Sequence, residues 1–183
     1  MYSIYTTPAL VLNIRPYGDN DMILTILTKK FGVLRAVATG LRKEKSKLRF
    51  SLQLLSLADI SLVKGKGIWR VTNAKHSESL LTEKRINLLE KIKLTITRLV
   101  QGEETGNLFE IVTKGILIDT DDVDAVEMII ILRILNDLGY IEGIGLEEFL
   151  KSTEITQELV EKSNEKKKEI IKVINKGFKV ADM

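Results

Sequence analysis

The sequence contains no cysteine and only one histidine among its 183 residues. Without cysteine the chain cannot form disulfides, thiol nucleophiles or thiolate zinc sites. His76 has no second histidine with which to share a metal, so we interpret it as a strand-end or surface residue. No apolar stretch approaches the roughly 20 residues that a membrane-spanning helix needs. The most apolar run, Met128–Leu132, ends at Arg133.

The first 18 residues have no basic leader before their apolar part, so we do not expect a secretory signal. The apolar share of 44% and the charged share of 29% are typical of a globular protein with a packed core. The simplest expectation is a cytoplasmic protein that binds no membrane.

Charge is distributed unevenly along the chain, although its formal net value is only +3. Residues 1–80 contain 13 Lys or Arg and 5 Asp or Glu, whereas residues 81–183 contain 15 and 20. The first balance, +8, attracts polyanions, and no amphipathic lipid-binding helix accompanies it. The first half of the chain therefore favours nucleic acid over a membrane as its partner.

The first part of the chain has the two-residue alternation of short strands. We expect strands over residues 9–15, 22–28, 33–39, 54–64 and 67–75. A long charged interruption separates the third strand from the fourth. Five contiguous antiparallel strands of this kind favour a small barrel, which leaves no open edges. We therefore expect a barrel domain over residues 1–78.

From residue 79 the apolar spacing changes to three and four residues, which predicts helices. We expect a first helix that ends near Gly102, a second over 108–116, and two polar ones over 155–163 and 165–176. Residues 119–140 have acids in the first turn and apolar residues nearly all round the centre, as in the buried helix of a bundle. The expected fold is therefore α+β, with an all-α bundle over residues 79–183.

No segment has the pattern of a catalytic or metal site. The acidic stretch Asp119–Glu127 has Asp124 where a calcium loop requires glycine, so we interpret its acids as helix-capping residues. Gly65–Trp69 lacks the Lys-Ser/Thr ending of a phosphate-binding loop, and we expect a hairpin turn there. We therefore predict a binding protein, not an enzyme, with no cofactor.

The segment ATGLRKEKSKLRF (Ala38–Phe50) carries five cations and one acid, Glu44. The cations are Arg42, Lys43, Lys45, Lys47 and Arg49. Clustered Lys and Arg side chains bind phosphates, so this segment is either a solvated loop or a nucleic-acid contact. The basic balance of the surrounding domain favours the contact. Four further cations extend it if they share its face: Arg35, Lys64, Lys66 and Arg70.

Three aromatic residues are candidates for stacking on single-stranded bases. Tyr17 follows the first expected strand, and Trp69 lies in the last one. We expect Phe50 to lie in the core, whereas Trp69 fits either the core or a binding groove.

Four motifs in a fixed order give the first 80 residues a resemblance to a known family. They are RPYGDND (15–21), LTKKFG (27–32), the basic run (36–49) and LVKGKGIWRVTNAK (62–75). Together they resemble the N-terminal domain of RecO, the bacterial recombination mediator. LRILNDLGY (132–140) is similar to a helix of the family's C-terminal domain. The resemblance extends over residues 8–80 and more loosely over 81–140.

The resemblance implies an oligonucleotide-binding (OB-fold) barrel followed by a helical domain, and a role in DNA repair and recombination. It also implies binding of single- and double-stranded DNA, strand annealing, and help in loading RecA onto strands coated by single-strand-binding protein (SSB). RecR and the acidic tail of SSB are the implied partners. By position, the implied phosphate contacts are Arg35, Arg42, Lys43, Lys45, Lys47 and Arg49, to which we add Lys66 and Trp69.

Three departures from the family stand out. Many relatives carry a four-cysteine zinc site where this chain has IEGIGLEEFLKSTE (141–154). The chain is also shorter than is usual, so we expect an abbreviated helical domain without a zinc site. Thr39 stands where relatives often have a lysine.

Two alternatives to DNA binding remain at this point. In one, the chain is a protein adapter whose basic loop binds an acidic peptide such as the SSB tail. In the other, it is a general single-strand nucleic-acid-binding barrel that takes RNA.

Overall fold

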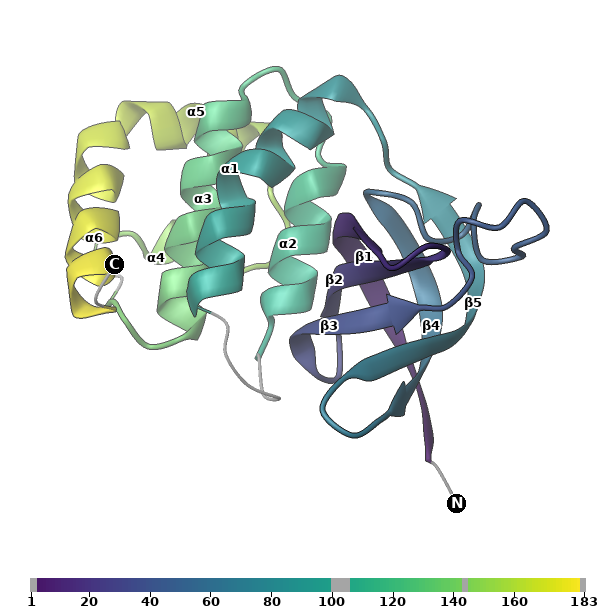
Figure 1. Ribbon diagram of the computed structural model, residues 1–183. Coiled ribbons are helices and arrows are strands. Elements are labelled where there is room, and N and C mark those ends of the chain that lie inside the picture. The colour runs from purple at the N-terminus through teal and green to yellow at the C-terminus, as the bar shows by residue number, and fades with distance from the viewer. Residues whose placement is uncertain (1–2, 100–105, 143–144, 182–183) are drawn as a thin grey trace. The chain divides into compact units, whose positions relative to one another are not determined.

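The computed structural model describes residues 3–99, 106–142 and 145–181. The chain forms two compact units, the first holding the strands up to Thr82 and the second the helices from Glu83 on. Figure 1 draws the strands in purple to teal and the helices in teal to yellow. The predicted α+β class is confirmed. No helix among the described residues is long and apolar enough to cross a membrane.

The first unit is a closed barrel with the strand order β1-β2-β3-β5-β4. Its strands are β1 (Ile4–Tyr17), β2 (Asp21–Thr28), β3 (Gly32–Ala38), β4 (Ser56–Lys64) and β5 (Trp69–Ser79). Strands β3 and β5 pair in parallel, whereas the other neighbours pair antiparallel. The predicted five-stranded OB-fold barrel is confirmed, but the parallel pair corrects the expectation of antiparallel strands throughout.

Strand β1 closes the barrel because it pairs with two neighbours along its length. Its first part, up to Leu10, pairs with β4, and its second part pairs with β2. The register shifts between Val11 and Asn13, as at a bulge that bends a strand. Alternate residues of the strands point inward, and Val11, Leu24, Ile26 and Ile60 are fully buried in the barrel core.

The second unit is built round one central helix. Its helices are α1 (Glu83–Leu99), α2 (Leu108–Leu117), α3 (Val123–Asp137), α4 (Glu147–Leu150), α5 (Gln157–Glu165) and α6 (Lys167–Val180). α3 contacts each of the others and buries residues on all sides, which confirms the prediction of a buried bundle helix. The short helix α4 was not expected, and the predicted helix end near Gly102 lies outside the described residues.

The acids before α3 cap the helix and pair with α1. Asp122 accepts a hydrogen bond from Ala125 N at 3.0 Å as the N-cap residue. Asp121 forms an ion pair with Lys84, and Asp124 lies 2.8 Å from Lys91 Nζ. The capping interpretation is therefore confirmed for Asp122, whereas Asp121 and Asp124 pair with lysines of α1 instead.

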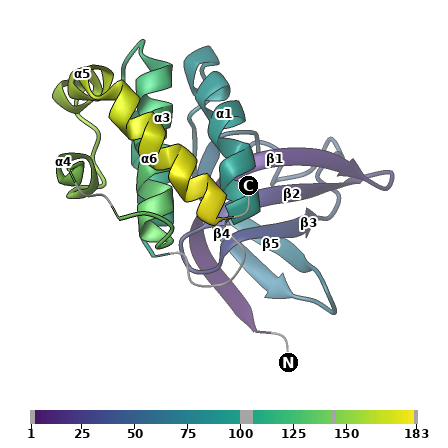
Figure 2. The same cartoon turned by 90° about the vertical axis from the view of Figure 1, so that its left-hand side faces the viewer.

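Helix α6 packs closely against α3 (Figure 2). Ile170, Ile174 and Gly177 form its buried face. A Cβ atom at Gly177 would lie 2.6 Å from Ile141 Cγ2, so only glycine permits this approach. The opposite face of α6 is left to solvent.

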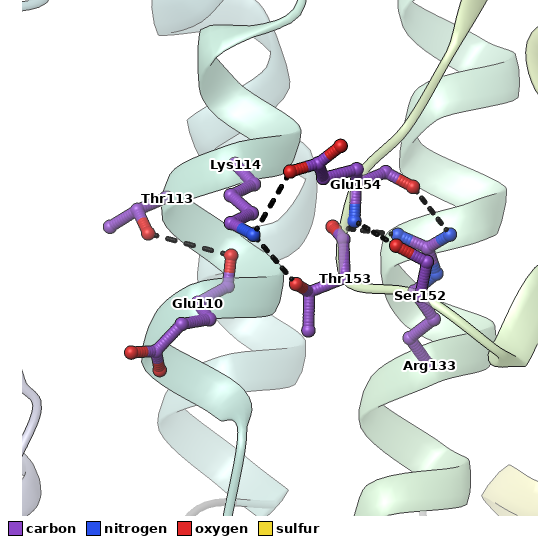
Figure 3. A network of polar contacts seen from close by, with 7 residues as sticks. All are labelled: Glu110, Thr113, Lys114, Arg133, Ser152, Thr153 and Glu154. Atoms are coloured by element: carbon purple, nitrogen blue, oxygen red, sulfur yellow. Dashed lines mark hydrogen bonds and ion pairs between the residues drawn. The ribbon is translucent and has the colours of Figure 1, made fainter.

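A buried arginine holds the segment after α4 in place (Figure 3). Arg133 on α3 is 3% exposed and donates hydrogen bonds to the carbonyl oxygens of Phe149 (2.6 Å), Thr153 (2.9 Å) and Glu154 (3.0 Å). Burial lowers the pKa of Arg133 to about 10, which leaves it protonated at neutral pH. Lys114 on α2 donates to Thr153 Oγ1 at 3.0 Å and so ties the same segment to a second helix.

Candidate nucleic-acid interface

The strand register places three arginines on one outer face of the barrel. Arg15 pairs with Ile23, Ile23 with Val37, and Val37 with Arg70. Residues that lie opposite each other in a sheet project to the same side. Arg35 is two residues before Val37 and therefore shares that side. The outer face of β1, β2, β3 and β5 thus presents Arg15, Arg35 and Arg70, all exposed.

The basic loop (residues 39–55) leaves β3 at the end of this face. It is a chain of short turns, in which Lys43 N, Ser46 N and Arg49 N each donate to the carbonyl three residues earlier, at 3.1, 3.0 and 3.3 Å. Leu41 and Leu52 are buried in the barrel core, 5% and 2% exposed, and Leu48 packs against it. The loop is therefore held by its apolar residues while its polar residues face solvent.

Two hydrogen bonds join the basic loop to the β1–β2 turn and the first residue of β2. Asp21 Oδ1 accepts from Gly40 N at 2.7 Å, and Asn20 O accepts from Arg42 N at 3.0 Å. Gly40 has a positive φ of 65°, a conformation that favours glycine. The first cations of the loop therefore lie beside the turn that follows Tyr17.

The loop cations are exposed and carry no countercharge. Among the described residues none of the five forms an ion pair or a side-chain hydrogen bond: Arg42, Lys43, Lys45, Lys47 and Arg49. Glu44 is the only acid within the loop. Unpaired cations on an ordered loop are available to an anionic ligand. The exposed Thr39 at the start of the loop adds no charge.

Two exposed aromatic rings accompany these cations. Tyr17, at the end of β1, is 51% exposed, and Phe50, in the loop, is 78% exposed. The prediction that Phe50 belongs to the core is therefore wrong, because Leu48 and Leu52 occupy the inward positions on either side of it. Exposed rings among cations are the arrangement that lets bases stack while phosphates are neutralised.

Trp69 has a structural place at the β4–β5 hairpin. Its ring centroid lies 5.7 Å from that of Tyr5 and 5.1 Å from that of Phe31, and Trp69 and Phe31 pack against the barrel core. Lys64 Nζ lies 5.5 Å from the Trp69 centroid, within cation–π range. Trp69 is half-buried, so its ring packs against the barrel core and also remains partly accessible to a ligand.

Lys66 lies at the tip of the same hairpin and is exposed. The turn is held by Gly65 N, which donates to Ile68 O at 3.0 Å, so the predicted hairpin is confirmed. His76 lies within β5 near a register shift, is 81% exposed, and has its Nδ1 3.2 Å from Asp59 Oδ2. In the described part of the chain no group of three or more acids and histidines could hold a metal ion.

Sequence reasoning missed Arg15. It precedes Pro16 in a turn motif, and only the β1–β2 register places it on the outer face beside Arg35 and Arg70. The structure thus unites Arg35 with Arg70 on one face, next to the loop that follows β3, whereas Lys66 and Trp69 belong to the β4–β5 hairpin.

Comparisons with known proteins agree with this architecture. The family described as "Recombination protein O N terminal" matches residues 1–80. The DNA repair protein RecO of Heliobacterium modesticaldum is 33% identical over 148 residues, which are 78% of this chain and 54% of that protein. The DNA repair protein RecO of Clostridium perfringens is 33% identical over 142 residues, which are 72% of this chain and 56% of that protein.

A third relative, the DNA repair protein RecO of Alkaliphilus metalliredigens, is 32% identical over 154 residues, which are 80% of this chain and 60% of that protein. The chain therefore spans little more than half the length of the curated relatives it matches. The matched barrel, and the similarity that continues into the helices, lead to one conclusion: the chain belongs to the RecO family.

Proposed function

We propose that this chain is a DNA-binding recombination mediator that acts in DNA repair without catalysing a reaction. The basic loop and the outer face of the barrel would hold the phosphate backbones of single- and double-stranded DNA, independently of sequence. The observation that carries this proposal is the set of five exposed loop cations that pair with no carboxylate of the described residues. Membership of a family whose relatives are named DNA repair proteins supports it further.

Strand annealing has a simple physical basis on such a surface. Two strands repel each other through their phosphates, and Lys and Arg contacts neutralise phosphates and release counterions. Arg15, Arg35 and Arg70 on the rigid outer face extend the area over which a strand can be neutralised. Base edges stay free to pair, because phosphate contacts carry no sequence information.

We also propose RecR, SSB and, indirectly, RecA as the protein partners. These assignments rest on the family resemblance alone. The helical unit would provide the docking surfaces, since its lysines on α1 and α5 are engaged in ion pairs such as Lys84–Asp121 and Lys162–Glu158 rather than in a phosphate-binding cluster.

The rival function is an adapter whose basic loop receives an acidic peptide such as the SSB tail. The exposed ring of Phe50 beside the cations favours this alternative, because it offers a peptide an apolar contact. Reversing the charge at Lys43, Lys45 and Lys47 separates the two functions. We expect the triple Lys→Glu variant to bind a labelled single-stranded oligonucleotide much more weakly than the wild type, with an unchanged melting temperature because no described residue pairs with these side chains.

The same variant is then tested with an acidic peptide that carries a fluorescent label. Loss of peptide binding with oligonucleotide binding intact would replace the DNA proposal with the adapter. Competition between RNA and DNA oligonucleotides of the same sequence identifies the preferred nucleic acid. A control variant, Lys84→Glu with Lys91→Glu and Lys162→Glu, makes the same charge change on the helical unit, and its melting temperature is measured with its affinity because it also breaks ion pairs.

A further inference from the structure

The outer face of helix α6 is a straight row of lysines. Lys168, Lys172, Lys176 and Lys179 follow each other at intervals of four, four and three residues, so they lie on one side of the helix. This side is opposite the buried Ile170, Ile174 and Gly177. All four lysines are exposed. With a rise of about 1.5 Å per residue, they form a ridge roughly 16 Å long.

These four lysines have no ion-pair partner among the described residues, unlike most other lysines of the helical unit. Six lysines of that unit pair with carboxylates: Lys84, Lys91, Lys93, Lys114, Lys162 and Lys166. Within the described residues, no carboxylate pairs with a lysine of the α6 ridge. Glu169 is the only acid between Lys167 and Val180. The α6 ridge is therefore strongly cationic, although residues 81–183 as a whole are acidic.

We propose that the α6 lysine ridge binds the phosphate backbone of a second nucleic-acid strand, in addition to the strand on the barrel. This inference rests on the proposed function and extends it, since one chain that holds two strands brings them close enough to anneal. Each lysine of the ridge can neutralise one phosphate. No aromatic residue lies on the ridge, so this surface would bind through charge alone, without stacking.

The chemistry of the ridge favours a nucleic acid over a membrane. A helix that binds at a membrane surface inserts its apolar face among the lipids. In α6 that face is buried against α3, with Ile170 completely covered. The exposed part is a row of like charges with the apolar Ile171 and Val180 at its margins. A regular row of single-sign charge matches a polyphosphate backbone.

The test uses the full chain and a background in which the barrel site is disabled. In the Lys43→Glu, Lys45→Glu, Lys47→Glu background we expect residual, salt-sensitive binding of a labelled 30-nucleotide single strand, the length being about twice one barrel site. Adding Lys172→Gln and Lys176→Gln should weaken that residual binding about tenfold or more at low salt. The matched control, Lys84→Gln with Lys162→Gln, removes the same charge from paired lysines and should change it by less than about twofold.

A second readout follows two strands at once. Two non-complementary oligonucleotides with different fluorophores should bind one wild-type chain together, giving energy transfer between the labels. The Lys172→Gln, Lys176→Gln variant should lose this transfer and retain binding of one strand. Circular dichroism melts should show unchanged stability for this variant, because neither side chain has a partner to lose.

The outcomes separate this proposal from the function proposed for the barrel. If the ridge substitutions change nothing while the loop substitutions abolish all binding, the ridge proposal is overturned and the barrel function stands. If the loop substitutions change nothing and the ridge substitutions abolish binding, the barrel function fails instead. Equal effects of the ridge and control pairs would mean that binding depends only on the net charge of the chain, and this would overturn the ridge proposal. Loss of binding only to vesicles that contain phosphatidylserine would assign it to membranes and overturn the proposal.

Discussion

Asp21 Oδ1 accepts a hydrogen bond of 2.7 Å from the backbone N–H of Gly40. An acid on a basic surface thus fixes the start of the loop that bears the cations. Its charge opposes an anionic ligand, whereas its hydrogen bond orders the loop that would bind the ligand. The two effects have opposite signs and can be separated by substitution.

Asp21→Ala removes both the charge and the hydrogen bond. We expect weaker oligonucleotide binding and a loss of stability of about 1–3 kcal/mol, because a charge-assisted hydrogen bond to the backbone is lost. Asp21→Asn keeps an acceptor oxygen and loses only the charge, so we expect affinity equal to or above that of the wild type. Fluorescence anisotropy and thermal melts measure both variants. Tighter binding by Asp21→Ala than by Asp21→Asn would show that the loop does not depend on this anchor.

The exposed ring of Phe50 should contribute to binding and not to folding. We expect Phe50→Ala to cost about 1–3 kcal/mol of binding free energy for single-stranded DNA, as for one stacked base. The melting temperature should not change, since the ring is 78% exposed. Phe50→Tyr serves as a conservative control and should restore affinity. An unaltered affinity in Phe50→Ala would show that the Phe50 ring does not stack on a bound base.

Trp69 should behave in the opposite way. Its ring packs with Tyr5 and Phe31 against the barrel core. We expect Trp69→Ala to destabilise the barrel by about 2 kcal/mol or more, and Trp69→Phe to recover most of that loss. Chemical denaturation measures both. A variant with full stability and impaired binding would instead place Trp69 in the interface.

Arg133 should be essential for the helical unit and neutral for the barrel. Arg133→Met removes three hydrogen bonds and leaves the carbonyl oxygens of Phe149, Thr153 and Glu154 without this donor. We expect a destabilisation of about 3 kcal/mol. Arg133→Lys keeps the charge but lacks the planar guanidinium group, so this variant should recover only part of the lost stability. Helical circular dichroism in denaturant measures the loss, and unchanged stability of Arg133→Met would contradict the role given to Arg133.

The helical unit should lose stability in acid. Hydrogen bonds from Lys84, Lys91 and Lys166 lower the pKa values of Asp121, Asp124 and Glu148 respectively. A carboxyl whose pKa is lower in the folded chain binds more protons when unfolded, so stability rises with pH between the two values. The contribution is complete above the unfolded pKa of about 4 and is lost as the pH falls through the lowered folded values.

Thermal melts between about pH 6 and pH 3 measure this dependence. The Lys91→Met variant removes the cation beside Asp124, and its melting temperature should fall less steeply with acid. Parallel curves for the two proteins would mean that the Lys91 ion pair contributes nothing to folding.

Much of the fold follows from the sequence alone, because alternation and helical spacing report directly which side chains are buried. The alternation of Leu34, Ala36 and Ala38 identifies β3, and the apolar centre of residues 119–140 identifies the buried helix α3. Pairing partners are not readable in this way. The parallel β3–β5 pair and the place of Arg15 on the outer face depend on contacts between distant segments.

The directions of the side chains in the basic loop are likewise not readable from the sequence. A run such as Lys47–Leu52 gives no period from which to tell an inward Leu48 from an outward Phe50, because successive turns set the direction of each side chain. Hydrophobicity alone predicts Phe50 in the core, and the turn geometry places it in solvent. The four-residue helix α4 is too short to leave a periodic signal.

The salt dependence of single-stranded DNA binding is the most direct measurement of the central claim, that the basic loop neutralises phosphates. If four or five phosphates are neutralised, log affinity should fall against log salt concentration with a slope of roughly −3, near −0.7 for each contact. The Lys43→Gln, Lys45→Gln, Lys47→Gln variant should have a slope of roughly −1. A flat salt response in the wild type, or the same slope in both proteins, would contradict the account.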